Sequence, residues 1–245
     1  MKTKTPGRKK GELFFCGIGI ERPADASIRT IQVLKSCDVI FYIHGDGNKL
    51  KDFFGAFCSD VRTYDGSAFK GMGDKARISF VGGAVCRELK RGRAVAYVTY
   101  GHPMLFSDGF NMANDCRSRG YVGKVIPAVS SLDAIMAVLA AEINLFRRGY
   151  QVCLGDDVLK PRDFVLSNGT VVLLGLDRIA GAGRFKSFCE RLKERYPPEH
   201  VVYGVRCGTG EEGDVLLTGR VDQLFGWSDQ IVHMMSLVLP GLRKS

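Results

Sequence analysis

The first half of the sequence alternates short apolar segments with segments of helical periodicity, and this alternation limits the possible folds more than any other feature. Residues 12–16, 39–43 and 94–99 are almost wholly apolar, which is typical of strands buried on both faces. Between the first two, residues 27–35 carry apolar side chains at helical spacing after a serine suited to an N-cap. Strands and helices in alternation predict a parallel sheet covered by helices on both faces.

The rest of this half continues the pattern. Two adjacent glycines, Gly82 and Gly83, weaken the helical pattern around them, and residues 65–75 are glycine-rich and typical of a loop. We expect an α/β domain with a mostly parallel, doubly wound sheet over residues 11–145. Its further strands are expected at 61–64 and 122–126, and its further helices at 50–57, 76–91, 109–119 and 131–141.

After residue 145 the rhythm changes to short strands with few long helices between them. Residues 207–214, "CGTGEEGD", are typical of a hairpin turn. This pattern predicts a second, mixed α/β domain over residues 146–245, with the boundary near residues 144–149. Its strands are expected at 150–154, 170–174, 201–206, 215–218 and 231–239, and one helix at 184–195.

The formal net charge of +9 does not by itself indicate a nucleic-acid partner, because much of it lies at the two ends. Seven of the 35 basic residues lie in residues 1–10 and 243–245, which leaves 28 basic against 26 acidic residues elsewhere. We interpret residues 1–10 as a basic, flexible tail and expect no nucleic-acid partner. The sequence shows neither a run of about 18 apolar residues nor a signal-peptide core, so we expect a cytoplasmic protein without membrane contact.

The eight cysteines and four histidines show no spacing typical of a metal site. No two cysteines lie closer than 18 residues in the sequence, so no C-x-x-C motif is present. We interpret the cysteines as small buried hydrophobic residues in a reducing compartment, and we expect no metal site.

Three turns that follow predicted strands carry the residues of greatest interest. Gly17 and Gly19 follow the first strand, "YGHP" at 100–103 follows the strand at 94–99, and "PAVSS" at 127–131 follows the strand at 122–126. Ligands of open α/β sheets bind at the carboxyl ends of the strands. The three turns are therefore predicted to face one crevice.

Other interpretations of these turns stay open on the residues alone. The dinucleotide-binding fingerprint requires a third glycine where Arg22 stands, and no Gly-Lys-Ser/Thr of a P-loop occurs. The glycines also suit a tight turn without a ligand, His102 suits a structural role, and Ser130 or Ser131 suits plain helix capping.

Together with "MSLVLP" at 235–240, the three turns resemble, in order and spacing, the tetrapyrrole methylase superfamily of S-adenosylmethionine-dependent methyltransferases. "GHP" stands where that superfamily has "GDP", and "GIGIERPAD" departs from its opening "G-x-G-P-G-D" loop. The stretch "YGHP" and residues 184–204, "RFKSFCERLKERYPPEHVVYG", further resemble its borosin-type branch, which N-methylates backbone amides of ribosomal peptides.

The resemblance implies two α/β domains, a cleft between them that binds S-adenosylmethionine and releases S-adenosylhomocysteine, and a homodimer. It implies that the following residues contact the cofactor: Gly17, Gly19, Tyr100, His102, Leu105, Ser130, Leu174, Val205, Met235 and Ser236.

The acceptor decides what further chemistry is needed. An amide nitrogen is a poor nucleophile that must lose its proton, and we predict that Tyr100 acts as base or relay, its pKa lowered by a cation such as Arg77. The borosin-type branch carries an arginine–tyrosine pair on the preceding helix. Ungapped counting places that pair at Asp74 and Ile78, with Arg77 and Phe80 close by.

Backbone N-methylation of a ribosomal peptide is therefore the main prediction, and two alternatives stay open. One is C-methylation of a tetrapyrrole, whose carboxylates would need basic residues around them. The other is a catalytically degraded module that still binds S-adenosylmethionine. The candidate basic residues for a tetrapyrrole acceptor are Arg22, Arg29, Arg147 and Arg148.

Overall fold

Five apolar segments of the N-terminal half pair side by side as parallel strands, which confirms the predicted parallel sheet. The computed structural model describes residues 11–44, 49–64, 66–160, 168–208 and 212–242. The predicted basic tail, residues 1–10, lies outside the described residues. The sheet has the order β3-β2-β4-β1-β5. Its strands are β1 (Leu13–Gly17), β2 (Val39–Tyr42), β3 (Val61–Thr63), β4 (Val95–Thr99) and β5 (Lys124–Ile126).

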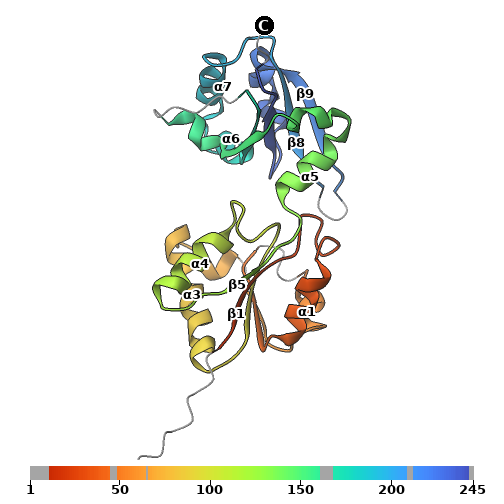
Figure 1. The fold of residues 1–245 in the computed structure, drawn as a ribbon. Helices are drawn as coiled ribbons and strands as arrows, with labels where there is room; N and C mark the ends of the chain where they lie inside the picture. Colours follow the sequence, from red (N-terminus) through yellow and green to blue (C-terminus); the bar gives the residue numbers. More distant parts are fainter. Residues whose placement is uncertain (1–10, 45–48, 65, 161–167, 209–211, 243–245) are drawn as a thin grey trace, which may run out of the picture. The chain divides into compact units, whose positions relative to one another are not determined.

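Helices cover both faces of this sheet, as Figure 1 shows. Alternate residues of one strand point to opposite faces, so Phe15 packs in the core under α3 and α4, whereas Cys16 packs in the core with α1 and α2. Both faces are apolar, and this explains the continuous apolar runs in the sequence. The helices are α1 (Ile28–Ser36), α2 (Lys51–Gly55), α3 (Asp74–Lys90) and α4 (Asp108–Ser118), with a 3-10 helix η1 (Gly66–Phe69).

The chain divides into two compact units, Met1–Ser131 and Leu132–Ser245. This division lies earlier than the expected boundary near residues 144–149. The reason is helix α5 (Ser131–Val138), whose Ile135 packs with Leu139 against buried side chains of the second sheet. The apolar face of this helix thus belongs to the core of the second unit, which the sequence pattern alone did not reveal.

The second unit contains a mixed sheet of order β6-β7-β10-β8-β9, as predicted for this half. Among the described strands of this sheet, β6 and β7 pair in parallel and the other neighbours pair antiparallel. The predicted hairpin turn at 207–214 connects the antiparallel strands β8 and β9, and its residues 209–211 lie outside the described residues. The strands are β6 (Tyr150–Leu154), β7 (Thr170–Leu174), β8 (Val201–Arg206), β9 (Val215–Arg220) and β10 (Ser236–Leu239). The helices are α6 (Leu176–Gly181), α7 (Phe185–Lys193) and the 3-10 helices η2 (Ala140–Phe146), η3 (Gly155–Leu159) and η4 (Val221–Gln230).

One predicted strand of this unit is shorter than expected. The apolar run 231–239 predicts a single strand, but β10 begins only at Ser236 because a turn precedes it. In this turn the amide of Met235 donates to the carbonyl of Val232 at 3.2 Å, and Met234 has a left-handed backbone with φ of 64°. The apolar residues before Ser236 therefore form a turn rather than part of the sheet.

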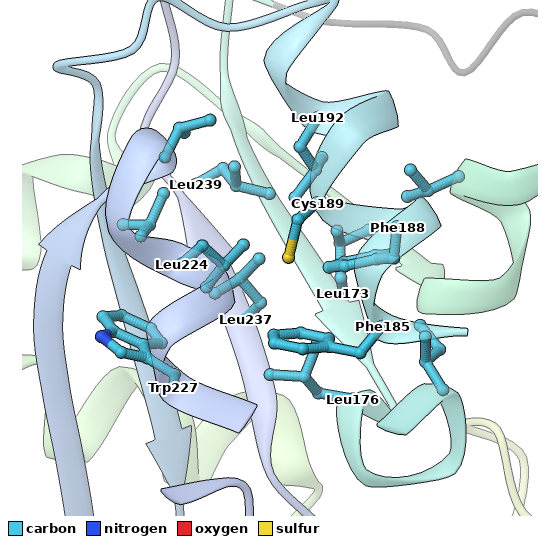
Figure 2. Packing of buried hydrophobic residues seen from close by; sticks show 14 of the residues in the cluster. Leu173, Leu176, Phe185, Phe188, Cys189, Leu192, Leu224, Trp227, Leu237 and Leu239 are labelled. Carbon is cyan, nitrogen blue, oxygen red and sulfur yellow. The ribbon is translucent and has the colours of Figure 1, made fainter. Parts of the chain in front are cut away.

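Helix α7 and η4 cover one face of the second sheet. Figure 2 shows Phe185, Phe188 and Leu192 of α7 packed toward Leu173 and Leu237 of the strands. The strong helical periodicity of residues 184–195 predicted this helix, and its apolar stripe is the face that is buried.

The cysteines lie largely where the sequence analysis expected them. Six of the eight are buried, Cys153 and Cys207 are half-buried, and all are free thiols. Burial, reinforced by neighbouring thiols and carboxylates, raises the pKa of Cys37 to about 12, so this side chain packs as a neutral hydrophobic residue. Among the described residues, the helices are too short or too polar to span a bilayer.

The two adjacent glycines of α3 give a testable contrast. A Cβ at Gly83 would have no neighbour nearer than 3.7 Å, whereas a Cβ at Gly82 would lie 2.0 Å from Oδ2 of Asp115 on α4. We expect Gly83→Ala to raise the free energy of unfolding by about 0.5–1 kcal/mol, because alanine favours a helix interior. Gly82→Ala loses this gain because Asp115 must move away from Arg119, its partner at 2.7 Å. Urea denaturation of both variants measures the difference, and equal stabilisation by both would contradict the close α3–α4 packing.

Candidate functional site

The first two predicted turns lie against each other at the carboxyl ends of β1 and β4. The amide of Ile18 donates to the carbonyl of Thr99 at 3.0 Å, and the amide of Gly101 donates to the carbonyl of Gly19 at 2.7 Å. From β1 the chain crosses to β2, and from β4 it crosses to β5 on the other side of β1. The ends of these two central strands are thus the topological switch point of the sheet, where open α/β sheets bind their ligands.

Gly17 is the point at which all three predicted turns meet. A Cβ at this position would lie 2.3 Å from the carbonyl oxygen of Gly101, 2.9 Å from Cβ of Ala128 and 3.0 Å from Cδ of Pro103. The backbone of "GIG" therefore touches both "YGHP" and "PAVSS", which confirms that the three turns share one edge of the sheet.

Side chains of the segment after β1 hold the first turn in shape. The hydroxyl of Thr30 is buried and donates to the carbonyl of Gly17 at 3.0 Å, and Ser27 caps α1 by accepting from the amide of Thr30. The carboxylate of Asp25 accepts the amides of Ile20 at 3.1 Å and Glu21 at 2.9 Å. The loop "GIGIERPAD" thus contains an aspartate that accepts the loop's own backbone amides. Asp25 lies later in the loop than the aspartate of the "G-x-G-P-G-D" pattern does.

The second turn is held by its own histidine. The amide of Met104 donates to Nδ1 of His102 at 3.1 Å, and the amide of Leu105 donates to the His102 carbonyl at 3.2 Å. An acceptor role for Nδ1 requires the neutral ring with its proton on Nε2. His102 therefore shapes the turn, and both His102 and Leu105 are half-buried beside the switch point.

Tyr100 contacts Arg22, which the sequence analysis named only for a tetrapyrrole acceptor, and His44. The guanidinium of Arg22 lies over the Tyr100 ring, 5.4 Å from its centroid. The ring of His44, which follows β2, meets Tyr100 edge-on with centroids 4.9 Å apart. His44 was not among the predicted site residues, although its place directly after a buried strand is the signal that would have identified it.

Arg77, the cation predicted to act on Tyr100, lies in a different cluster. It forms ion pairs with Asp108 at 2.9 Å and Asp74 at 3.2 Å, and its guanidinium lies 5.9 Å from the ring centroid of Phe69. Burial lowers the pKa of Arg77, but the charge and hydrogen bond of Asp108 and the charge of Asp74 together raise it above the usual value. The cation that the structure places over the Tyr100 ring is Arg22.

The charge of Arg77 acts on the phenol of Tyr97, a residue of β4 that lies before Tyr100. Burial, together with the charge of Asp108, raises the pKa of Tyr97 well above 10, so its hydroxyl is neutral. Phe80, the other neighbour of the expected arginine–tyrosine pair, is 48% exposed and has ring contacts with Tyr64 and Phe69.

Buried polar atoms at the switch point suit a polar ligand. The hydroxyl of Thr99 is fully buried and has no hydrogen-bond partner among the described residues. Ser130, in the third turn, is also buried. Gly19 and Gly101 have φ of 81° and 61°, a left-handed conformation that glycine adopts without strain, and Asp25 and Ile20 lie where side chains at these two positions would point. An unpartnered buried hydroxyl such as that of Thr99 suits a bound cofactor with polar groups.

The predicted contacts of the second unit lie mainly in one row of the sheet. Ser236 pairs with Val205, and continuing the register of Leu237 with Leu173 places Leu174 opposite Ser236. Leu174 and Val205 pack on the face that α5 covers. The Met235 side chain instead lies in the core under α7, on the opposite face of the sheet. Met235 would therefore contact a ligand on the face that α5 covers through its backbone.

Among the described ranges, no three histidine, cysteine, aspartate or glutamate side chains gather closely enough to hold a metal ion.

Comparison with known proteins shows which proteins the chain resembles. The sequence profile of the family described as "Tetrapyrrole (Corrin/Porphyrin) Methylases" matches residues 12–224. A protein of Anomoporia bombycina described as a methyltransferase and ribosomally synthesized type III borosin cyclic peptide precursor is 25% identical over 236 residues. These residues are 96% of this chain and 25% of that protein. The chain spans about a quarter to a half of the length of the first curated relatives that it matches.

Two further matches belong to the chemistry of tetrapyrroles. Precorrin-6A synthase (deacetylating) of Sinorhizobium sp is 22% identical over 237 residues, which cover 87% of this chain and 85% of that protein. The solved structure of uroporphyrin-III-C-methyltransferase from Thermus thermophilus superposes with a TM-score of 0.65 at 23% identity, covering 95% of this chain and 93% of that one. The structural likeness shows a shared fold.

Proposed function

This chain belongs to the family of tetrapyrrole (corrin/porphyrin) methylases, and on that premise we propose that it transfers a methyl group from S-adenosylmethionine to backbone amides of a ribosomal peptide. The observation that carries the proposal is the meeting of the three turns at Gly17, at the switch point of the parallel sheet. The buried hydroxyls of Thr99 and Ser130 suit the polar groups of this cofactor.

Tyr100, His102 and Leu105 would line the site from the end of β4. Leu174, Val205, Met235 and Ser236 stay the cofactor contacts that the resemblance implies for the second unit. S-adenosylmethionine supplies an already activated methyl group, so the protein has mainly to bind, orient and exclude water.

Tyr100 and its neighbours favour an amide acceptor. An amide nitrogen must lose its proton before it can accept a methyl group, and negative charge then develops on the acceptor. Tyr100 is half-buried at the end of β4, with the cation of Arg22 over its ring. A positive charge beside a phenol favours its ionised form. We therefore propose that Tyr100 takes or relays the amide proton and that Arg22 supports it, in the role that the sequence assigned to Arg77.

Replacing Tyr100 with phenylalanine tests this role. We expect Tyr100→Phe to lower the rate of methyl transfer by a factor of about 10²–10⁴, because the proton acceptor is lost. Its affinity for S-adenosylmethionine should stay unchanged, because the aromatic ring remains. Tyr121→Phe, at a half-buried tyrosine before β5, is the matched control. Methylation rates come from intact-mass analysis, and unchanged turnover of Tyr100→Phe would refute the proposed proton transfer.

C-methylation of a tetrapyrrole is the second candidate function, and two observations favour it. Precorrin-6A synthase matches over most of its length, and Arg147 and Arg148 line a hollow of about 550 Å³ in the second unit. Mass analysis with a peptide and with a reduced tetrapyrrole separates the two functions. Addition of CH₂ masses to the tetrapyrrole alone would replace the peptide proposal.

The third possibility is a module that binds S-adenosylmethionine without transferring its methyl group. Calorimetry with S-adenosylmethionine and S-adenosylhomocysteine separates it from an enzyme. Binding without turnover of any peptide or tetrapyrrole would support the module, and no binding of either compound would refute the methyltransferase proposal. The cytoplasmic location and the homodimer stay predictions from the sequence and its resemblance.

A further inference from the structure

A turn in the second unit is held by one carboxylate in a way that the proposed cofactor contacts do not explain. The turn comprises residues 232–235 and leads directly into β10. Oδ2 of Asp177, the second residue of α6, accepts the amide of Met234 at 3.0 Å and lies 3.0 Å from Nδ1 of His233. The Asp177 side chain is only 18% exposed, whereas that of His233 is 86% exposed.

The backbone of this turn is unusual for the residue that occupies it. Met234 has φ of 64°, a left-handed conformation that side chains other than glycine rarely adopt. Such a conformation persists where the surroundings impose it. The hydrogen bond from the Met234 amide to Asp177 is the contact that imposes it here, because it fixes the peptide group before Met234.

A second tether joins the same two segments. The amide of Leu176 donates to the carbonyl of Met235 at 2.9 Å, so α6 holds the turn at two consecutive residues. Directly after this point Ser236 enters the sheet beside Val205. The position of Ser236 therefore depends on how the turn before it is closed.

We propose that Asp177 is a positioning residue, which holds the turn 232–235 so that the backbone of Met235 and the hydroxyl of Ser236 are set for the cofactor. This inference rests on the proposed function, because it assumes that Met235 and Ser236 contact S-adenosylmethionine. Asp177 itself acts through Met234. The exposed His233 ring is a lesser partner, because water competes for its hydrogen bond.

Calorimetry on the full chain with S-adenosylhomocysteine as the probe tests the inference. Loss of one positioning hydrogen bond in Asp177→Ala should weaken binding about tenfold. Asp177→Asn retains an oxygen that can accept the Met234 amide, so most of the affinity should remain. The control His233→Gln leaves the Asp177–Met234 contact in place and should bind like the wild type.

A double variant separates positioning from general destabilisation. Glycine adopts a left-handed backbone without strain, so Asp177→Ala combined with Met234→Gly should recover much of the lost affinity. A defect elsewhere in the fold would not be rescued by glycine at position 234. Equal affinity of wild type and Asp177→Ala, or no recovery in the double variant, would overturn the positioning role.

Hydrogen exchange at the Met234 amide keeps this inference distinct from the proposed function. It should be slow in the wild type and faster in Asp177→Ala, whether or not the cofactor is present. If hydrogen exchange at the Met234 amide is the same in both proteins, Asp177 does not hold the turn, even if the cofactor binds. If the wild type binds neither S-adenosylmethionine nor S-adenosylhomocysteine, the proposed function fails, and the positioning role fails with it. Hydrogen exchange still reports whether Asp177 holds the Met234 amide.

Discussion

Gly17→Ala is expected to weaken the binding of S-adenosylmethionine by about a hundredfold, which corresponds to the loss of about two hydrogen bonds to the cofactor. The added methyl group would lie 2.3 Å from the carbonyl oxygen of Gly101. This neighbour is a backbone atom that is itself fixed, since the Gly101 amide donates to the carbonyl of Gly19. The turns must therefore move apart, and this movement separates the groups that would hold the cofactor.

The same substitution should also lower the free energy of unfolding by about 1–3 kcal/mol, the usual cost of an overpacked site. Gly55→Ala is the matched control, because a Cβ at Gly55 would meet no atom within 4 Å. Calorimetry with S-adenosylmethionine and thermal unfolding measure the two effects. Wild-type affinity in a folded Gly17→Ala variant would contradict the location of the site at this switch point.

Glu88→Gln is expected to give the largest loss of stability, about 3 kcal/mol. Glu88 is 2% exposed and accepts hydrogen bonds from Arg62 at 3.1 Å, Arg91 at 2.8 Å and Arg93 at 2.9 Å. Arg62 and Arg93 also pair with Asp60. Removing the Glu88 charge leaves three guanidinium groups with one carboxylate, and two of these groups are largely shielded from water.

The pH dependence of stability provides a second measurement of the same cluster. Burial raises the pKa of Glu88, but the hydrogen bonds from Arg93 and Arg62 outweigh burial and lower it below the usual value. Hydrogen bonds from Arg62 likewise lower the pKa of Asp60. A carboxylate with a lowered pKa in the folded state stabilises the protein above the pKa of the unfolded chain, about 4. This stabilisation is lost as the pH falls through the folded-state pKa, so Glu88→Gln should show a weaker decline of stability below about pH 4.

Glu194→Gln is the control for both measurements. Glu194 pairs with Arg191 on the surface of α7, where 55% of the glutamate side chain is exposed, and such a pair contributes at most about 1 kcal/mol. Urea denaturation followed by circular dichroism gives the free energies. Trp227, the single tryptophan of the sequence, lies in the second unit, so its fluorescence reports that unit separately. A loss no greater for Glu88→Gln than for Glu194→Gln would contradict the buried cluster.

The strands, and the fact that the three turns meet, could be predicted from the sequence for one physical reason. Parallel strands place their carboxyl ends at a common edge, so "GIG", "YGHP" and "PAVSS" had to lie near one another once the strands were recognised. The left-handed glycines and the N-cap at Ser27 are local features whose geometry neighbouring residues decide. Local rules were less reliable at 231–239, where an apolar run became a turn because Asp177, distant in sequence, holds Met234.

The sequence by itself determined the alternation of strands and helices, the glycine positions at the strand ends and the family that they resemble. Only the tertiary structure decided which side chains meet. Arg22 lies over Tyr100, and Arg77 pairs with Asp108, because the loop after β1 and the start of α3 approach different parts of the strand ends. Distant residues meet according to how whole elements pack, and this packing is a sum over many contacts that no short segment of sequence contains.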